Sequence, residues 1–406
     1  MASVEYESEY RELYQNCPLK NIIIFRSGPM PESYIKGMDF DDNARALFEY
    51  ALSINLQKEY ELVWLVKNPE EWEDKFSCYN NIFFFSYEDA ESEDKVRRDK
   101  YFRALCLAKY IFMTDTYGFA MRSRADQTRI MLWHGCGFKA RLGNCSCADK
   151  YEYMTVTGDE YARIYAEAFG LRSEQMLVTG YPKVDYIFHP LSGWQKILNI
   201  PKASKYIFWL PTFRNTDTEG LERHNHTKPK GETGLPLVNS LQELRKIDEI
   251  LSAAGTILLI KLHPFQNRSM VNNLTGFLNI YLLEHDVLLE HGIHINHLLG
   301  YADALISDYS SVAVDYLVLD RPIGFTLDDM DTYGKERGFF WEDVRKWLPG
   351  EEIYNFQDFI SFIRDVMANK NLGYEKRKSI SEQMQKYRDD QNSLRVLNVL
   401  GICQPL

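Results

Sequence analysis

The sequence predicts an α/β fold of two doubly wound, Rossmann-type domains that face a central cleft. Short apolar runs rich in β-branched residues alternate with amphipathic helical segments along most of the 406 residues, which is typical of parallel sheets covered by helices on both faces. The alternation loosens around residues 191–204 and then restarts, and a chain of this length is expected to form two or three domains. We therefore expect an N-terminal domain of residues 1–195 and a C-terminal domain of residues 196–406, whose last helices are candidates to pack back on the first domain.

The first half of the chain contains the elements of one such domain. It opens with an apolar run at residues 21–25, followed by a helix whose apolar stripe includes Ala44, Leu47 and Ala51. Further strands are expected at residues 62–66, 82–85, 110–114, 129–133, 153–157 and 176–179, and helices at residues 69–75, 95–107 and 159–169.

The second half repeats this alternation. Strands are expected at residues 206–210, 256–262, 279–283, 304–306 and 321–325, and helices at residues 241–254, 292–299, 312–319, 356–367 and 379–400. Residues 215–236 are polar, contain glycine and proline and lack any periodicity. This segment is therefore predicted to be a long mobile loop.

The strand, polar turn and helix at residues 304–319 form the strongest candidate binding site. The turn holds Ser307, Asp308, Ser310 and Ser311, and serine and aspartate are residue types that cap helix N-termini. Convergent N–H groups, hydroxyls and the positive end of a helix dipole suit a phosphate or diphosphate. The same pattern also fits an ordinary strand-to-helix turn. This segment alone therefore does not distinguish an anion site from such a turn, and evidence from other segments is needed.

Two histidines follow predicted core strands directly. His134, with Gly135 after it, follows the strand at residues 129–133, and His263 follows the strand at residues 256–262. Ligands of open parallel sheets bind beyond the carboxyl ends of the strands, so both are candidate site residues, although a histidine in such a place can also be a hydrogen-bonded structural residue. The turn after residue 179 carries Lys183, which either reaches a phosphate or belongs to a surface turn.

No segment predicts a metal site. Cys145 and Cys147 lack the spacing of a zinc-binding pair, and His291, His294 and His297 have no evident carboxylate or fourth ligand beside them. We expect these histidines to line a polar face. No pair of carboxylates stands out near the predicted anion site, so a divalent metal cofactor is not expected.

Composition limits the classes of function. The formal net charge of -11 argues against general nucleic-acid binding, which needs lysine and arginine to neutralise phosphates. The seven cysteines are scattered, the first residues are polar, and no apolar run approaches the roughly 20 residues that span a bilayer. We expect a reduced cytoplasmic protein whose contact with a membrane is peripheral.

Seven segments, in this order, resemble the CDP-glycerol glycerophosphotransferases, which are enzymes of teichoic-acid and capsule polymers. The segments are DDNARALFEY, LWHGCGFKARLG, TGYPKVD, LPTFR, IKLHP, ISDYSSVAVDY and RPIGFTLDDMDTYGKERGF. The resemblance implies a GT-B-like architecture whose C-terminal domain binds most of the donor nucleotide. It also implies transfer of a polyol phosphate from a CDP-polyol to a hydroxyl of a lipid-linked saccharide or growing polymer, with release of CMP, at the inner face of a bacterial cell membrane.

The resemblance also implies roles for single residues. His134 is the candidate general base, because a neutral imidazole can accept the proton of a weakly nucleophilic hydroxyl, and His263 is expected to stabilise charge on the diphosphate. The residues expected to bind the donor are Lys183, Arg214, Ser307, Asp308, Ser310, Ser311 and Arg337. The residues expected on the acceptor side are Asp42, Asn43, Gly135 and Lys139.

Two other functions are compatible with such a fold, because a fold does not fix the chemistry. One is a GT-B glycosyltransferase that uses a nucleotide sugar and releases a nucleoside diphosphate instead of CMP. The other is a non-catalytic nucleotide-binding protein, in which His134→Ala would leave the biological role intact. Glycerol is the first choice of polyol, with ribitol as the alternative.

Overall fold

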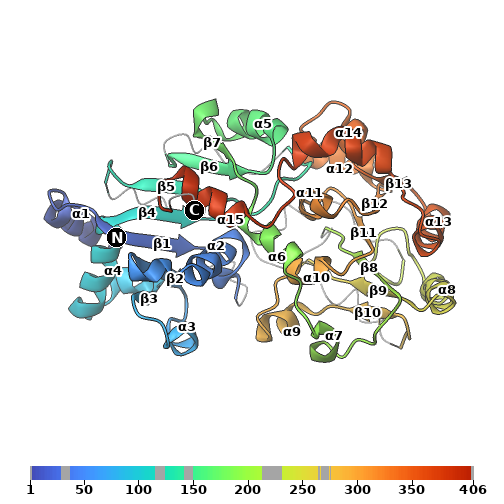
Figure 1. Cartoon of the computed structure of the whole chain (residues 1–406), viewed down its shortest axis with the longest axis horizontal. Coiled ribbons are helices and arrows are strands. Elements are labelled where there is room, and N and C mark those ends of the chain that lie inside the picture. Colours follow the sequence, from blue (N-terminus) through green and yellow to red (C-terminus); the bar gives the residue numbers. More distant parts are fainter. Residues whose placement is uncertain are drawn as a thin grey trace.

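Two parallel β-sheets form the cores of two lobes that lie side by side (Figure 1). The computed structural model describes residues 2–28, 37–114, 124–140, 150–212, 231–263, 266, 274 and 276–403. Alternate residues of the central strand of the first sheet enter separate apolar cores: Ile22 and Ile24 contact one core, and Ile23 and Phe25 contact the other. Both faces of this sheet are therefore covered, as the continuous apolar runs predict.

The N-terminal sheet has the strand order β3-β2-β1-β4-β5-β6-β7. Its strands, all parallel, are β1 (Lys20–Arg26), β2 (Glu61–Val66), β3 (Ile82–Ser86), β4 (Ala108–Met113), β5 (Thr128–Met131), β6 (Tyr153–Val156) and β7 (Met176–Val178). The helices in this half of the chain are α1 (Ala2–Tyr14), α2 (Asp42–Ser53), α3 (Glu70–Phe76), α4 (Lys95–Leu107), α5 (Asp159–Phe169), α6 (Asp185–Phe188) and α7 (Trp194–Ile197). The last of them, α7, lies in the C-terminal lobe, where the Trp194 ring contacts those of Tyr206 and Tyr301 (Figure 1). The chain builds the sheet outward from β1 to one edge and then from β4 to the other, so the order reverses between β1 and β4.

The C-terminal sheet has the strand order β10-β9-β8-β11-β12-β13, also parallel. Its strands are β8 (Lys205–Trp209), β9 (Thr256–Ile260), β10 (Ile280–Leu282), β11 (Ala304–Ser307), β12 (Ile323–Thr326) and β13 (Glu351–Ile353). The helices are α8 (Leu241–Ser252), α9 (His285–Glu290), α10 (Asn296–Leu299), α11 (Val312–Tyr316), α12 (Met330–Arg337), α13 (Phe356–Met367), α14 (Tyr374–Met384) and α15 (Asn392–Val399). Here the order reverses between β8 and β11, which places the turn after β11 at the position where doubly wound sheets bind ligands.

The last helical segment differs from the expectation. A single helix at residues 379–400 was expected, whereas the chain forms α14 and α15 with a break at residues 385–391. The backbone at the break bonds to the N-terminal domain: Thr157 Oγ1 donates to the Met384 carbonyl at 2.6 Å, and the Lys386 N–H donates to the Thr157 carbonyl at 2.8 Å. These contacts compensate the helical hydrogen bonds that the break removes.

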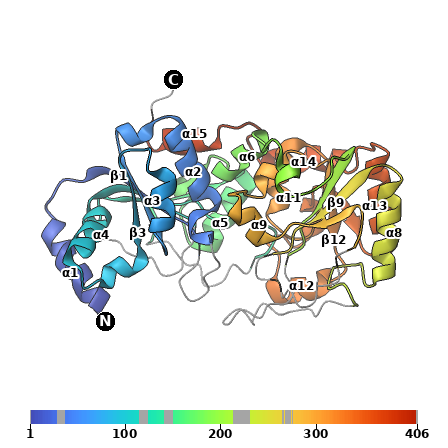
Figure 2. The same ribbon diagram turned by 90° about the horizontal axis from the view of Figure 1, so that it is seen from below.

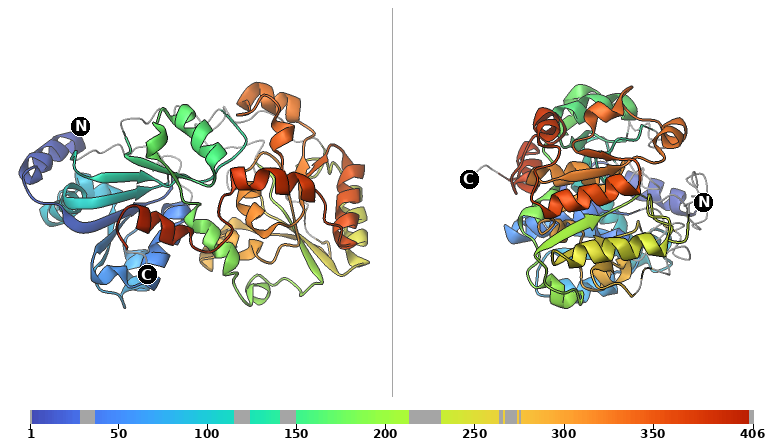
Figure 3. Two further views of the ribbon diagram at one scale, coloured as in Figure 1. Left: turned by 45° about the horizontal axis from the view of Figure 1, so that its top comes forward. Right: turned by 90° about the vertical axis from the view of Figure 1, so that its right-hand side faces the viewer.

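The chain then returns to the N-terminal lobe, where α15 is the dark red helix in Figure 3. Asp185 of α6 is the main anchor, because its buried carboxylate accepts two hydrogen bonds from Asn392 and two from Ser393, at 2.7 to 3.0 Å. The phenol of Tyr110 in β4 donates to the Leu400 carbonyl at 3.2 Å. Residues from the end of the chain are therefore part of the N-terminal core.

No helix in the described part of the chain is long and apolar enough to cross a membrane.

The Asp185 anchor can be tested by substitution. We expect Asp185→Ala to lower the free energy of unfolding by about 2–3 kcal/mol, because it leaves several buried donors without an acceptor. Asp390→Ala is the matched control, since Asp390 is an exposed residue of the same tail that bonds to His189, and it should change stability by less than about 0.5 kcal/mol. Urea denaturation measures both, and equal effects of the two substitutions would contradict the anchor.

Candidate functional site

The loop that follows β5 packs against the turn that follows β11. A Cβ atom added to Gly135 would lie 2.2 Å from Ser311 Oγ and 2.5 Å from Ser311 Cβ, and one added to Gly137 would lie 3.5 Å from the Ser311 nitrogen. Residue 135 must therefore be glycine for the two loops to touch. The two predicted motifs, one in each domain, thus meet in space.

A second contact joins the same loop to the segment after α12. Lys139 and Phe339 form an isolated antiparallel bridge. The Ala140 N–H donates to the Gly338 carbonyl, and the Phe340 N–H donates to the Phe138 carbonyl, both at 3.1 Å. The apolar core continues across this contact, since Phe138 and Phe340 pack into the same cluster.

The ring of His134 keeps a solvent-exposed face. The protein around it nevertheless desolvates the imidazolium, and this effect, followed by the positive charges of Lys139 and Lys183, lowers the pKa of His134 to about 3. The imidazole is therefore neutral near pH 7, as a general base has to be.

His263 follows β9 and is half-buried. Burial lowers the pKa of this imidazole well below its usual value, and Lys261, Lys139 and His134 lower it further. Two of these groups, Lys139 and His134, belong to the N-terminal domain. His134, in the N-terminal domain, thus influences the charge of His263 in the C-terminal domain.

Cationic side chains gather beside these histidines. Burial, and then the charge of Arg337, lowers the pKa of Lys139 to about 8, although Asp308 acts in the opposite direction. None of the ion pairs among the described residues involves Lys139. A bound anion would supply the negative charge that this lysine lacks, so the position suits a phosphate group.

Lys183 lies in an ion-pair network between the domains. Its ammonium is 3.0 Å from Asp42 Oδ1 and 3.7 Å from Asp315 Oδ2, and it donates to the His134 carbonyl. Burial alone would lower the pKa of Lys183, but the two carboxylates raise it above its usual value. Burial also raises the pKa of Asp42 to about 6, against the effect of Lys183.

Several residues expected to contact substrate have partners in the protein instead. Asn43 is fully buried, donating to the Trp133 carbonyl and accepting from the Lys183 N–H. Ser307 is fully buried and donates to the Leu210 carbonyl at 2.9 Å. Their geometry does not support direct contact with a substrate, because neither side chain is presented to a ligand.

The expected helix cap is also wrong in its details. Asp308 is buried, and its Oδ2 accepts from the N–H and the hydroxyl of Thr212, at 3.0 and 2.7 Å. The helix that follows, α11, spans only five residues, and Ser311 at its N-cap makes no side-chain cap bond. Ser310 and Ser311 are half-buried, so they keep their place as predicted donor ligands, as does Arg337.

The remaining expectations divide into two groups. Arg214, the cysteines at 145 and 147 and most of the loop expected at residues 215–236 lie outside the described residues. His294 and His297 are half-buried between the domains, beside charged groups and Tyr186, whose ring centroid is 3.9 Å from that of His297. Figure 2 shows α9 beside α2 at this boundary, where Arg45 donates to the Gly292 carbonyl at 2.8 Å.

The described residues contain no group of three or more potential metal ligands.

The sequence reasoning missed Asp315 and Asn296, which complete the network around Lys183. Asn296 Nδ2 donates to the Lys183 carbonyl at 3.1 Å. Asp315 stands inside the ISDYSSVAVDY segment, and a buried acid on the apolar face of a helix is a signal that could have identified it.

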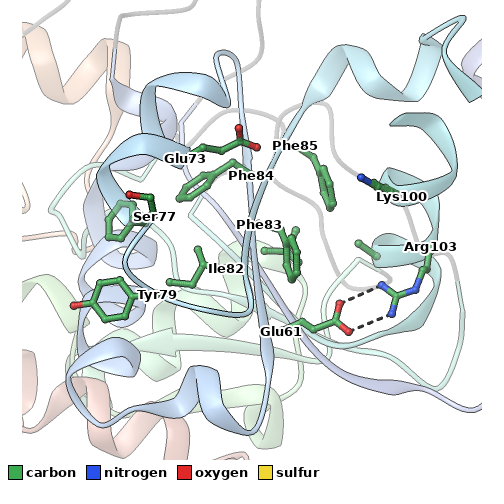
Figure 4. A pocket seen from close by; sticks show the side chains of 13 residues that line it. Glu61, Glu73, Ser77, Tyr79, Ile82, Phe83, Phe84, Phe85, Lys100 and Arg103 are labelled. Atoms are coloured by element: carbon green, nitrogen blue, oxygen red, sulfur yellow. Dashed lines mark hydrogen bonds and ion pairs between the residues drawn. The ribbon is translucent and has the colours of Figure 1, made fainter. Parts of the chain in front are cut away.

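A pocket of about 450 Å³ lies away from these residues, at the edge strand β3 (Figure 4). It is lined by Tyr79, Phe83 and Phe85 and by the Glu61–Arg103 ion pair of 3.1 Å. None of the predicted site residues lines it.

Comparisons with known proteins show which sequences this chain is similar to. The model of the CDP-glycerol:poly(glycerophosphate) glycerophosphotransferase family matches residues 21–401. The chain is 27% identical to the teichoic acid ribitol-phosphate polymerase TarK of Staphylococcus aureus, but it spans only 58% of that relative's length. It is 25% identical to a teichoic acid glycerol-phosphate transferase of Staphylococcus aureus and to a teichoic acid glycerol-phosphate primase of Bacillus subtilis, with 96% of this chain covered in each and 95% and 98% of the relatives.

Solved structures agree with the fold. The wall teichoic acid polymerase TagF superposes with a TM-score of 0.69 at 21% identity, covering 98% of this chain and 94% of that chain. A UDP-GlcNAc 2-epimerase from Neisseria meningitidis, solved with UDP-GlcNAc, gives a TM-score of 0.51 at 13% identity, with 94% and 99% covered. The two parallel-sheet domains are thus GT-B-like, as expected. On the match to residues 21–401, the chain belongs to the CDP-glycerol:poly(glycerophosphate) glycerophosphotransferase family.

Proposed function

We propose that this chain transfers a polyol phosphate, with glycerol phosphate as the first choice, from a CDP-polyol to a hydroxyl of a lipid-linked saccharide or growing polymer. The observation that carries the proposal is the contact between the His134 loop and the Ser310–Ser311 turn, in a chain of this family. Glycerol comes first because the relatives matched over nearly their whole length are a glycerol-phosphate transferase and primase.

In the proposed reaction, the acceptor oxygen attacks the phosphorus that carries the polyol. The bond from this phosphorus to the oxygen of CMP breaks, and CMP leaves with the electron pair of that bond. His134 accepts the proton of the acceptor hydroxyl, which its neutral imidazole allows. The leaving CMP gains negative charge, which Lys139, Arg337 and the hydroxyls of Ser310 and Ser311 would stabilise.

Donor binding and catalysis are coupled in this arrangement. The positive charge of Lys139 is one cause of the low pKa of His134. A bound diphosphate would offset that charge and raise the pKa of His134, which makes the imidazole a stronger base when the donor is present. We assign no metal cofactor, because cationic side chains can neutralise the diphosphate.

The acceptor determines where the protein would work. A lipid-linked saccharide lies at a membrane surface, so we propose that the protein acts peripherally at the cytoplasmic face of the cell membrane. The formal net charge of -11 would oppose nonspecific binding to anionic lipid, and the acceptor itself would then supply most of the attraction.

The donor is tested by calorimetric titration of the purified protein with CDP-glycerol, CDP-ribitol and UDP-glucose. We expect one CDP-polyol to bind and UDP-glucose to show no binding, because the family transfers polyol phosphate and not sugar. Binding of UDP-glucose alone would overturn the proposal and favour a glycosyltransferase.

The contact between the two loops is tested at two neighbouring glycines. Gly135→Ala should lower turnover on the order of 100-fold, because its Cβ collides with Ser311 and separates the loops. Gly137→Ala is the matched control in the same loop, since its Cβ meets neighbours at ordinary contact distance. Similar turnover of the two variants, measured as CMP release, would show that the loops need not touch.

A further inference from the structure

The backbone just before His134 is strained. Trp133 has a φ of 57°, in the left-handed region that bulky side chains rarely adopt and that costs about 1–3 kcal/mol. The indole is buried and contacts the Phe169 ring edge-to-face, with centroids 4.9 Å apart. Such a conformation persists only where surrounding groups hold it.

Two buried side chains hold the two peptide groups that follow the strained residue, one on each side of His134. Asn43 Nδ2 donates to the Trp133 carbonyl at 2.8 Å, and Lys183 Nζ donates to the His134 carbonyl at 2.5 Å. Asn43 is 0% and Lys183 is 6% exposed. The two residues also bond to each other, because the Lys183 N–H donates to Asn43 Oδ1 at 3.1 Å.

The ammonium of Lys183 already has partners within the protein. An ammonium has three N–H donors, and three acceptors surround this one: the His134 carbonyl at 2.5 Å, Asp42 at 3.0 Å and Asp315 at 3.7 Å. Two of these acceptors lie within hydrogen-bond distance and Asp315 forms an ion pair, so a phosphate would compete with two carboxylates that already neutralise the ammonium. The arrangement therefore argues against Lys183 as a donor ligand.

The contacts of Asn43 and Lys183 with the Trp133 and His134 carbonyls are called the clamp below. Asp315 extends this clamp into the C-terminal domain, because it forms an ion pair with Lys183. It lies four residues after Ser311 on α11, so it belongs to the same turn and helix as the proposed donor site. Asn296 of α10 adds a second link by donating to the Lys183 carbonyl at 3.1 Å. The same lysine thus contacts the loop that carries His134, the proposed base, and the helix α11, which follows the Ser310–Ser311 turn on the donor side.

We propose that Asn43 and Lys183 are positioning residues that hold the strained Trp133–His134 backbone, and that Lys183, through Asp315, fixes His134 relative to the donor-side turn. The inference rests on the proposed function only in taking His134 as the base. It replaces the expectation that Lys183 binds the donor and that Asn43 contacts the acceptor.

The clamp also has an electrostatic consequence. The charged and titratable groups that face His134 are Lys139 on its own loop, Lys183 on the segment before α6 and His263 after β9. Lys183 is one of the two cations that lower the pKa of His134. Removal of its charge should therefore raise the pKa of His134, whereas loss of a remote structural contact should not.

The test compares Lys183→Met with Lys386→Met. Lys386 forms an exposed ion pair with Asp159, at 3.0 Å, that also joins the two halves of the chain, so it controls for loss of an interdomain charge pair. For Lys183→Met we expect the kcat of CMP release to fall about 100-fold, while the calorimetric Kd for CDP-glycerol stays within about threefold of wild type. Lys386→Met should match wild type in both. A Kd raised more than tenfold with unchanged kcat would make Lys183 a donor ligand and overturn the inference.

A second measurement does not depend on activity. Histidine-selective NMR, with the His134 signal assigned from its absence in His134→Ala, gives the pKa of His134 directly. We expect a higher pKa in Lys183→Met than in wild type and no change in Lys386→Met. An unchanged pKa of His134 in Lys183→Met would contradict the clamp even if the chain catalysed another reaction. Equal turnover of His134→Ala and wild type, in contrast, would show that His134 is not the base. The pKa measurement would then still test whether Lys183 holds the His134 backbone.

Lys183→Met leaves two carboxylates facing each other and so risks misfolding. Asp315→Asn and Asn43→Ala are then the variants to compare, because both keep the lysine: the first removes the ion pair with Lys183, and the second removes the two hydrogen bonds of Asn43, to the Trp133 carbonyl and from the Lys183 N–H. We expect each to lower kcat at least fivefold with little change in Kd, and Lys183→Arg to recover part of the activity of Lys183→Met. Wild-type kcat in both Asp315→Asn and Asn43→Ala would overturn the inference.

Discussion

Three acceptors from two domains converge on the Lys183 ammonium, and the geometry of the proposed site depends on this contact. Asp42 lies in the N-terminal half and Asp315 in the C-terminal half, and the carbonyl of His134 is the third acceptor. A buried ammonium is stable only when such partners compensate its desolvation. The same contact therefore joins the domains and sets the backbone of the candidate base. The close packing of Gly135 on Ser311 completes the junction.

Charge is distributed unevenly over this junction. The protein carries a formal net charge of -11, yet burial and the charge of Arg337 lower the pKa of Lys139, and Asp308 only partly opposes them. Lys183, in contrast, is neutralised by its two carboxylates. The site thus separates a cation that builds the structure from a cation available to an anionic ligand, a distinction that residue type alone does not reveal.

The sequence predicted the parts of the structure that depend on local pattern. Alternation of apolar runs and helical stripes predicted the strands of both sheets except β13, and the position of His134 and His263 after core strands made these two residues candidates for the site. Hydrogen bonds and ion pairs between residues far apart in the sequence could not be predicted from local pattern. The roles of Asn43 and Asp315 depend on partners more than 80 residues away in the sequence, and the break between α14 and α15 is stabilised by another domain. The helix α1 was missed because its sequence is polar almost throughout.

The central claim, that one site built from both domains transfers a polyol phosphate, is tested most directly by the identity of the product. Phosphorus NMR of wild-type protein incubated with CDP-glycerol and a soluble analogue of a lipid-linked saccharide distinguishes the bonds that can break. We expect CMP to appear as glycerol phosphate becomes a diester on the acceptor. Release of CDP, or a donor that stays intact while bound, would contradict it.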